Sequence, residues 1–151
     1  MNLAKYDIDI KPDFKSFEFF SEGPKGKIKK VIQFTRINGL NTLSDTYNLG
    51  FGDYDEGKGR IDDLIVSDNK DSEKVLSTVA TAVILFTNKH PKASVVAQGS
   101  TPARMRYYIM GIARHLPEII GEFEIWGAIG KNNWEPFRKN MPYLALLVNR
   151  K

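Results

Sequence analysis

The chain contains no cysteine and only two histidines among its 151 residues. Without cysteine it can have no disulfide framework, no thiolate zinc site and no cysteine nucleophile. His90 and His115 are too few for a multi-histidine metal centre. Any chemistry must therefore rest on arginine, tyrosine, serine, threonine and the carboxylates, and the sequence predicts no metal centre and no cofactor.

Long apolar runs are also missing. The longest stretch, residues 79–86, is interrupted by Thr81 and falls far short of the ~20 residues that a membrane-spanning helix needs. Residues 1–15 carry three aspartates, whereas a secretory signal has an uninterrupted apolar region of about 7–15 residues. We therefore expect a cytoplasmic protein that makes no contact with a membrane.

The standard nucleotide and catalytic loops are absent as well. The sequence has neither G-x-x-x-x-G-K-[ST] nor G-x-G-x-x-G, and it has no G-x-S-x-G nucleophile elbow. Acidic residues gather between positions 53 and 68, but not with the spacing of a calcium-binding loop. These absences exclude the commonest nucleotide cradles and a standard calcium site.

The chain is nevertheless rich enough in apolar residues to fold. It is 42% hydrophobic and has nine phenylalanines, six tyrosines and two tryptophans, which argues against disorder. A length of 151 residues is typical of one domain. We therefore predict a single α+β domain over residues 1–151.

Charge is distributed unevenly along the chain. The net charge is +3 over residues 1–40, −6 over residues 41–73 and +7 over residues 74–151. One interpretation is a basic face that binds phosphates or an acidic partner. The alternative is an ordinary solvated surface with local ion pairs.

Hydrophobic periodicity changes from two to 3.6 near residue 70, which predicts strands followed by helices. The fold class is α+β, with a mainly antiparallel sheet of about six strands, two helices on one face and the order β-β-β-β-α-β-α-β-β. A polar loop is expected over residues 52–59. The expected strands are 16–20, 27–37, 43–51, 61–66, 94–98, 122–129 and 143–148. The first helix is expected to be capped by Asp68, Asn69, Asp71 or Ser72 and to end near residues 89–91, and the second to span 102–116.

The most suggestive segment joins the strand at 94–98 to the second helix through a tight Gly-Ser-Thr turn. Free N–H groups at a helix start, the hydroxyls of Ser100 and Thr101, and the side chains of Arg104 and Arg106 would form an anion site. We therefore predict binding of a nucleic-acid backbone or a nucleotide phosphate. The alternative is a well-capped amphipathic helix, with Pro102 in its first position and its arginines in solvent.

The same helix carries the candidate catalytic residues. Arg104, Tyr108 and His115 share one helix face, while Met105 and Ile109 belong to an opposing apolar stripe that should meet the core. Tyr107, Tyr108 and His115 are the acid–base candidates for an enzyme that transfers acyl groups or cleaves RNA. A histidine near the end of a helix is also explained by the helix dipole alone.

Two further segments suggest contacts with partners. Residues 132–140 combine Trp134 and Phe137 with Arg138 and Lys139, a mixture that suits stacking on exposed bases. A capping segment that buries both aromatic rings is the alternative. An exposed sheet edge at residues 27–37 would allow a homodimer.

Three motifs together resemble a family of uncharacterised small bacterial proteins. They are S-E-G-P-K-G at 21–26, Y-N-L-G-F-G-D at 47–53, and Gly99-Ser100-Thr101 followed by Arg104. The resemblance covers nearly the whole chain and implies a compact bacterial protein of one domain. Genes of this size and type often lie in defence or toxin–antitoxin neighbourhoods, so we expect such a context.

A shorter motif at residues 103–112 resembles the A-R-x-L-Y-x-x-x-G-F pattern of the Gcn5-related acetyltransferases. Arg106 stands in place of leucine and Ile112 in place of phenylalanine. This resemblance implies acyl transfer with Tyr107 as the general acid. The family's R/Q-x-x-G-x-G/A pyrophosphate loop has no counterpart, because residues 68–73 are acidic and lack glycine.

Overall fold

The computed structural model describes residues 5–37, 45–62, 69–99, 101–119, 121–131 and 133–151. Nine strands and two helices follow one another along this part of the chain. They are β1 (Asp9–Ile10), β2 (Ser16–Gly23), β3 (Gly26–Arg36), β4 (Thr46–Asp55), β5 (Arg60–Asp62), α1 (Ser72–Lys89), β6 (Ser94–Ala97), α2 (Pro102–Ile119), β7 (Phe123–Gly130), β8 (Asn133–Pro136) and β9 (Leu146–Arg150).

The nine strands form one mixed sheet in the order β1-β2-β3-β4-β6-β9-β7-β8, with β5 beside β4. Only β4 and β6 run parallel among these pairs, and all the other pairs are antiparallel. The predicted α+β class is confirmed. The predicted sheet of about six strands was too small, because β1 and β8 have only two and four residues and give no periodic pattern.

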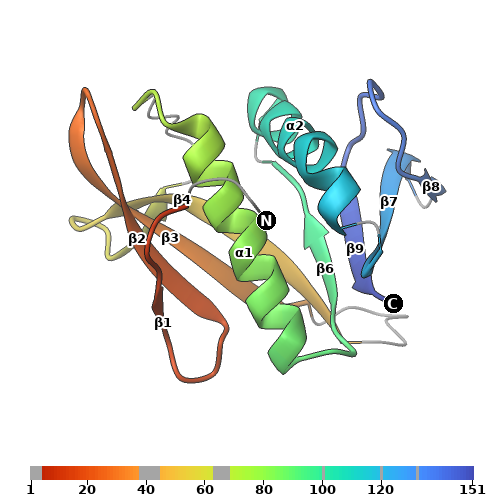
Figure 1. Ribbon diagram of the computed structural model, residues 1–151, viewed down its shortest axis with the longest axis horizontal. Coiled ribbons are helices and arrows are strands. Elements are labelled where there is room, and N and C mark those ends of the chain that lie inside the picture. Colours follow the sequence, from red (N-terminus) through yellow and green to blue (C-terminus); the bar gives the residue numbers. More distant parts are fainter. Residues whose placement is uncertain (1–4, 38–44, 63–68, 100, 120, 132) are drawn as a thin grey trace.

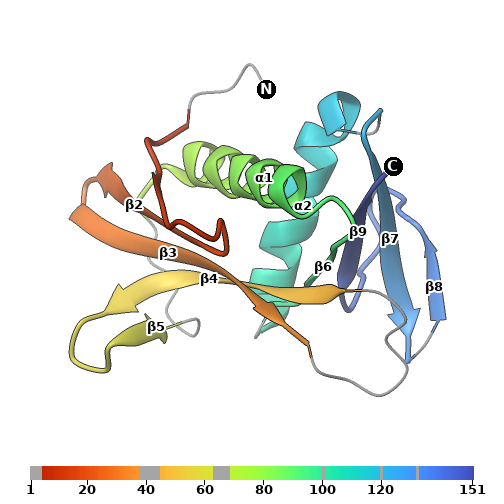
Figure 2. The same ribbon diagram turned by 90° about the horizontal axis from the view of Figure 1, so that it is seen from below.

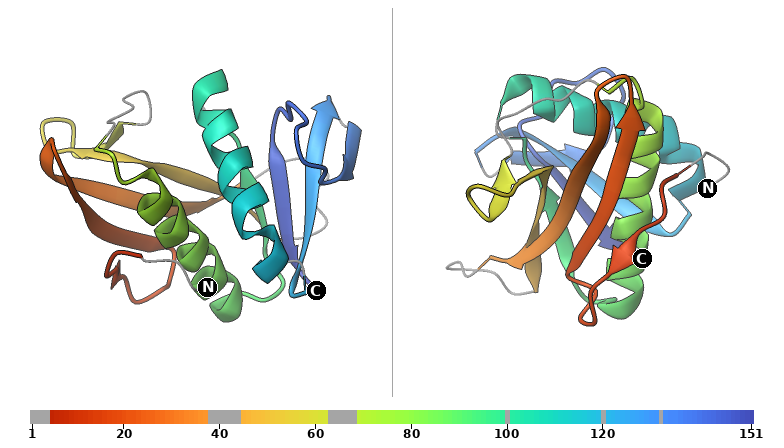
Figure 3. Two further views of the ribbon diagram at one scale, coloured as in Figure 1. Left: turned by 45° about the horizontal axis from the view of Figure 1, so that its top comes forward. Right: turned by 90° about the vertical axis from the view of Figure 1, so that its left-hand side faces the viewer.

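Both helices cover the same face of the sheet and lie side by side (Figures 1 and 2). α1 begins on the side of the sheet where β4 ends (Figure 2), and α2 follows directly on β6. Because β4 and β6 are parallel, both helices begin at the same edge of the sheet. The left view of Figure 3 shows the starts of α1 and α2 at that common edge. Ligands of open α/β sheets commonly bind where parallel strands end, so this edge is the first place to look for a site.

The β2–β3 hairpin has the structure that its sequence predicts. Gly23 pairs with Gly26 across a two-residue turn, and Gly26 adopts a φ of 89°, a conformation that residues with a Cβ rarely adopt. Phe17 and Phe19 are both buried, as their period-two spacing predicts. Phe34 of β3 stacks on Phe86 of α1 with ring centroids 4.1 Å apart, which anchors α1 to the sheet.

Four predictions about the chain path need correction. The expected loop at 52–59 is shorter, because β4 continues to Asp55 and turns directly into β5. Residues 133–136 form an edge strand, and α2 continues past Pro117 to Ile119. Residues 27–37 offer no free edge for a homodimer, because β3 is hydrogen-bonded to β2 on one side and to β4 on the other.

Within the described ranges, neither helix combines the length and the apolar character that crossing a bilayer requires.

Candidate functional site

The start of α2 is built around Thr101 and Gly99. The backbone N–H of Arg104 donates to Thr101 Oγ1 at 3.2 Å, so Thr101 caps the helix. Gly99 lies so close to the first turn that a Cβ there would stand 2.4 Å from the nitrogen of Met105. The turn therefore packs tightly on the helix, and only glycine fits at position 99. Ser100 lies outside the described residues.

Arg104 points into the molecule rather than towards solvent. It is 9% exposed, and its Nη1 donates to the carbonyl oxygen of Phe51 at 2.9 Å. On that edge of β4, residues 46–49 pair with β6 and residues 53–55 pair with β5. Arg104 therefore satisfies a carbonyl in the gap between two neighbouring strands, and its guanidinium does not face a ligand in solvent.

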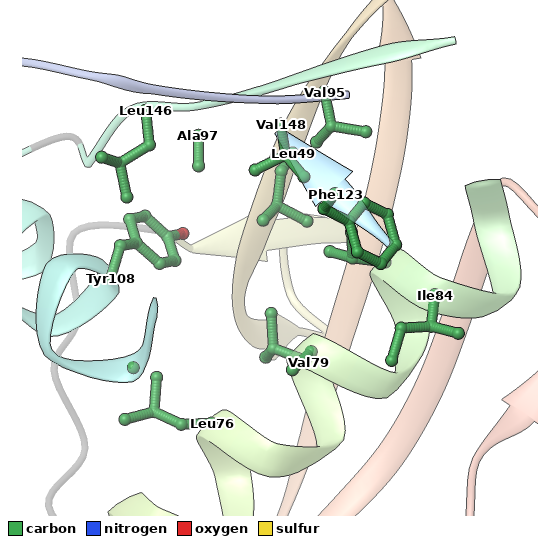
Figure 4. Close-up of a pocket in the computed structure, with 13 residues that line it drawn as sticks. Leu49, Leu76, Val79, Ile84, Val95, Ala97, Tyr108, Phe123, Leu146 and Val148 are labelled. Atoms are coloured by element: carbon green, nitrogen blue, oxygen red, sulfur yellow. The ribbon is translucent and has the colours of Figure 1, made fainter. Parts of the chain in front are cut away.

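The helix face that carries Arg104 is the buried face of α2. Tyr108 and Gly111 lie on the same face and are also buried, and a Cβ at Gly111 would stand 2.8 Å from Leu76 Cδ2 of α1. Tyr108 turns its ring and hydroxyl into an apolar cavity between the helices and the sheet (Figure 4). This cavity has a volume of about 60 Å³, well below the roughly 300–1,000 Å³ of ligand pockets.

The two tyrosines among the catalytic candidates lie in different surroundings. The hydroxyl of Tyr107 donates to the carbonyl oxygen of Ser72 at 3.3 Å, at the start of α1, whereas Tyr108 lines the apolar cavity. The side chain of His115 lies outside the described part of the structure. In addition, the carboxylates of Asp71 and Glu73 stand at the start of α1, where the acetyltransferase resemblance would require room for a pyrophosphate.

A groove of about 480 Å³ runs between the start of α2 and the segment that precedes β9. Tyr143 forms part of its wall and is itself buried. The Tyr143 ring lies where a Cβ of Gly127 would be, at 2.3 Å from Cδ1, and its hydroxyl accepts from the N–H of Arg138 at 2.9 Å. The lining consists of Gln98, Gly99, Thr101, Pro102, Met105, Arg106 and Ile109 on one side and Pro142, Tyr143 and Leu144 on the other.

Arg106 is the cation of this groove. Its side chain is exposed, no carboxylate of the described residues forms an ion pair with it, and none of the described lining residues is acidic. Thr101 lines the same groove, and its hydroxyl, which already accepts from Arg104, still has a proton to donate. Two of the four predicted ligand-binding residues thus meet in one groove, while Arg104 faces the sheet.

A buried polar cluster lies at the start of α1 and was not predicted from the sequence. Asn69 is 2% exposed; its Nδ2 donates to Ser21 Oγ at 3.1 Å and to the oxygen of Gly26 at 2.9 Å. Its Oδ1 accepts from the N–H of Lys25 at 2.7 Å. We call this set, together with Asp71 and Tyr6, the hairpin clasp, because it ties the β2–β3 turn to α1.

Asp71 and Tyr6 complete the hairpin clasp. The Asp71 carboxylate accepts from Ser21 and, at 2.6 Å, from the Tyr6 hydroxyl. Asp71 directly precedes α1 and was one of several capping candidates, but its side chain makes no capping hydrogen bond because it is bound to these two hydroxyls. The members of the hairpin clasp are hydrogen-bonded to one another, so the cluster holds the β2–β3 turn against the start of α1.

The stability of the chain at alkaline pH is expected to depend on Tyr6. Burial, and next the hydrogen bond to Asp71, raise the pKa of the Tyr6 phenol. Because the folded state favours the neutral phenol, its contribution is complete below the unfolded pKa of about 10 and is lost as pH rises through the higher folded value. The stability difference between the wild type and Tyr6→Phe should therefore shrink above about pH 10 in urea unfolding. A difference that does not change with pH would contradict this account.

A buried ion pair was also missed. Lys30 lies on the same face of β3 as Ile28 and Ile32, two residues from each. It forms an ion pair with Asp53 of β4. Both side chains are largely buried. The signal was present in the sequence, because a lysine in the middle of an apolar stripe indicates a partner of opposite charge on the neighbouring strand.

The two aromatic side chains of residues 132–140, Trp134 and Phe137, lie in different environments. Trp134 is 38% exposed on the edge strand β8, so the prediction that a capping segment buries it is wrong. Phe137 is half-buried and packs against Tyr143 with centroids 5.5 Å apart. Neither ring lines the groove beside Arg106, and base stacking by Trp134 stays a prediction.

The comparison with known proteins agrees with the motif-based expectation of a family without an assigned activity. No curated protein and no solved structure matches the chain. A family of unknown function, DUF6934, matches residues 2–151, which is nearly the entire chain. The chain therefore belongs to the DUF6934 family.

Proposed function

We propose that the protein binds a phosphate-bearing ligand, a nucleotide or a nucleic-acid backbone, in the groove between α2 and the segment before β9. The observation that carries this proposal is that Arg106 and Thr101 line the same groove and no described acidic side chain does. A guanidinium forms strong, charge-assisted hydrogen bonds to phosphate oxygens, and a hydroxyl is a common additional donor to them. The net charge of +7 over residues 74–151 adds long-range attraction for an anion.

The proposal no longer depends on the N–H groups at the start of α2. Thr101 Oγ1 and the Thr101 carbonyl oxygen accept from the N–H groups of Arg104 and Met105 at 3.2 and 3.0 Å. Pro102 has no N–H to offer. Phosphate recognition is therefore assigned to side chains that line the groove, with Arg106 as the principal one.

Replacing Arg106 with glutamine should weaken binding of a single-stranded oligonucleotide about tenfold at low salt, because one phosphate loses its cation. The slope of log K against log salt should also become shallower by about 0.7, the value for one contact to a single strand. Fluorescence anisotropy over a salt series measures both quantities. Arg106 is exposed, so its replacement should leave the fold intact.

Arg36→Gln is the matched control, because it removes the same charge from an exposed side chain on β3 that pairs with Asp45. Its affinity and its salt slope should equal those of the wild type. Two results would reject the proposal: no binding of oligonucleotides or mononucleotides at low salt, or equal loss of binding in both variants. The second result would indicate attraction by net charge without a site.

A further inference from the structure

The two most exposed large apolar side chains of the described residues belong to the elements that form the groove. Leu144 is 57% exposed and lines the groove opposite α2. Met110 is 60% exposed and lies one helical turn after Arg106. Apolar surface beside a cation suits a ligand that carries both an anionic and an apolar part.

The backbone holds Leu144 in this exposed position. Its N–H donates to the oxygen of Ala128 at 2.9 Å. Tyr143 and Ala145, its two neighbours, are both buried, so the alternation of an extended chain turns Leu144 outward. The exposure of Leu144 therefore follows from the register of this segment and is a fixed feature of the groove.

Gln98 adds a neutral polar group to the same groove. It follows the last residue of β6 and is exposed. A side-chain amide offers both a donor and an acceptor, which match the polar edge of a nucleobase. A hydrocarbon chain or a bare sugar phosphate would leave either the amide or the apolar wall without a complementary group.

We infer that the groove binds a nucleotide unit, with its phosphate at Arg106 and Thr101 and its base against Leu144 and Ile109. This inference rests on the proposed function, because it places the phosphate at Arg106. The groove volume of about 480 Å³ lies within the roughly 300–1,000 Å³ of small-molecule sites. The unit is the same chemistry whether it comes as a free mononucleotide or as one residue of a single strand.

Isothermal titration calorimetry with ribose 5-phosphate, adenosine 5′-monophosphate and a single-stranded oligonucleotide tests this inference. The wild type should bind the mononucleotide about tenfold more tightly than ribose 5-phosphate, because the base covers apolar surface. Leu144→Ser should abolish that difference and leave the affinity for ribose 5-phosphate unchanged. Ile10→Ser is the matched control, since Ile10 is an exposed aliphatic residue on β1, at the far edge of the sheet.

The outcomes separate this inference from the proposed function. Equal affinity of the wild type for ribose 5-phosphate and the mononucleotide would overturn the base-binding inference and leave phosphate binding at Arg106 standing. Binding of none of the three compounds would overturn both. An oligonucleotide that binds far more tightly than the mononucleotide supports the inference with a single strand as the source, and equal binding supports it with a free nucleotide as the source.

Discussion

Replacing Asn69 with alanine is expected to lower the free energy of unfolding by about 2–4 kcal/mol, because three hydrogen bonds of a buried side chain are lost together. Its partners are Ser21 Oγ, the carbonyl oxygen of Gly26 and the N–H of Lys25. Gly23 packs against the Asn69 backbone so closely that a Cβ there would stand 2.0 Å from the Asn69 oxygen. Little space is therefore available for water to replace the lost amide.

Urea unfolding followed by circular dichroism measures this effect, with Asn88→Ala as the control. Asn88 is exposed on α1, and its replacement should change stability by less than about 0.5 kcal/mol. Asn69→Asp sharpens the test, because it keeps the acceptor for Lys25 but loses the donors and adds a charge near Asp71. A loss as large as that of the alanine variant is expected. If both Asn69 variants were as stable as the wild type, the hairpin clasp would have no structural role.

The sequence predicts most elements of this fold because their residues alternate strongly. Phe17 and Phe19 indicate the inner face of β2, and the helical spacing of Val75, Leu76 and Val79 indicates the buried stripe of α1. What it does not predict is which strands become neighbours. The parallel pairing of β4 with β6 involves four residues of each strand, and nothing in either segment specifies the other as its partner.

Only part of the candidate site could be predicted from the sequence, and Arg104 shows why. Charged residues are expected to be exposed to solvent, so the face of α2 that carries Arg104 was expected to lie on the surface. The structure turns that face inward, because the edge of β4 has a gap that a guanidinium can fill. Such a gap arises only from the packing of β5, β6 and α2 together. Thr101 and Arg106, in contrast, were predicted from local signals and do line one groove.

Arg104→Met is expected to destabilise the fold by about 2–4 kcal/mol without removing phosphate binding from the folded protein. Methionine retains much of the side-chain length but donates no hydrogen bond, so the carbonyl oxygen of Phe51 is left without its partner at a buried position. The residues of β4 around Phe51 lie between the pairings with β6 and β5, where no neighbouring strand takes over that bond. Arg104→Lys should recover part of the loss, since lysine keeps the charge but not the planar set of donors.

Two measurements on Arg104→Met separate a structural role from a ligand-binding role. Urea unfolding reports the stability, and oligonucleotide anisotropy under conditions where the variant is folded reports the groove. The expected result is a lower unfolding midpoint with an affinity within about twofold of the wild type, the opposite of Arg106→Gln. A folded Arg104→Met protein that no longer binds would mean that this guanidinium reaches the ligand. The phosphate site would then have to be placed at the gap in β4 and no longer at Arg106, since the two side chains lie on different faces of α2.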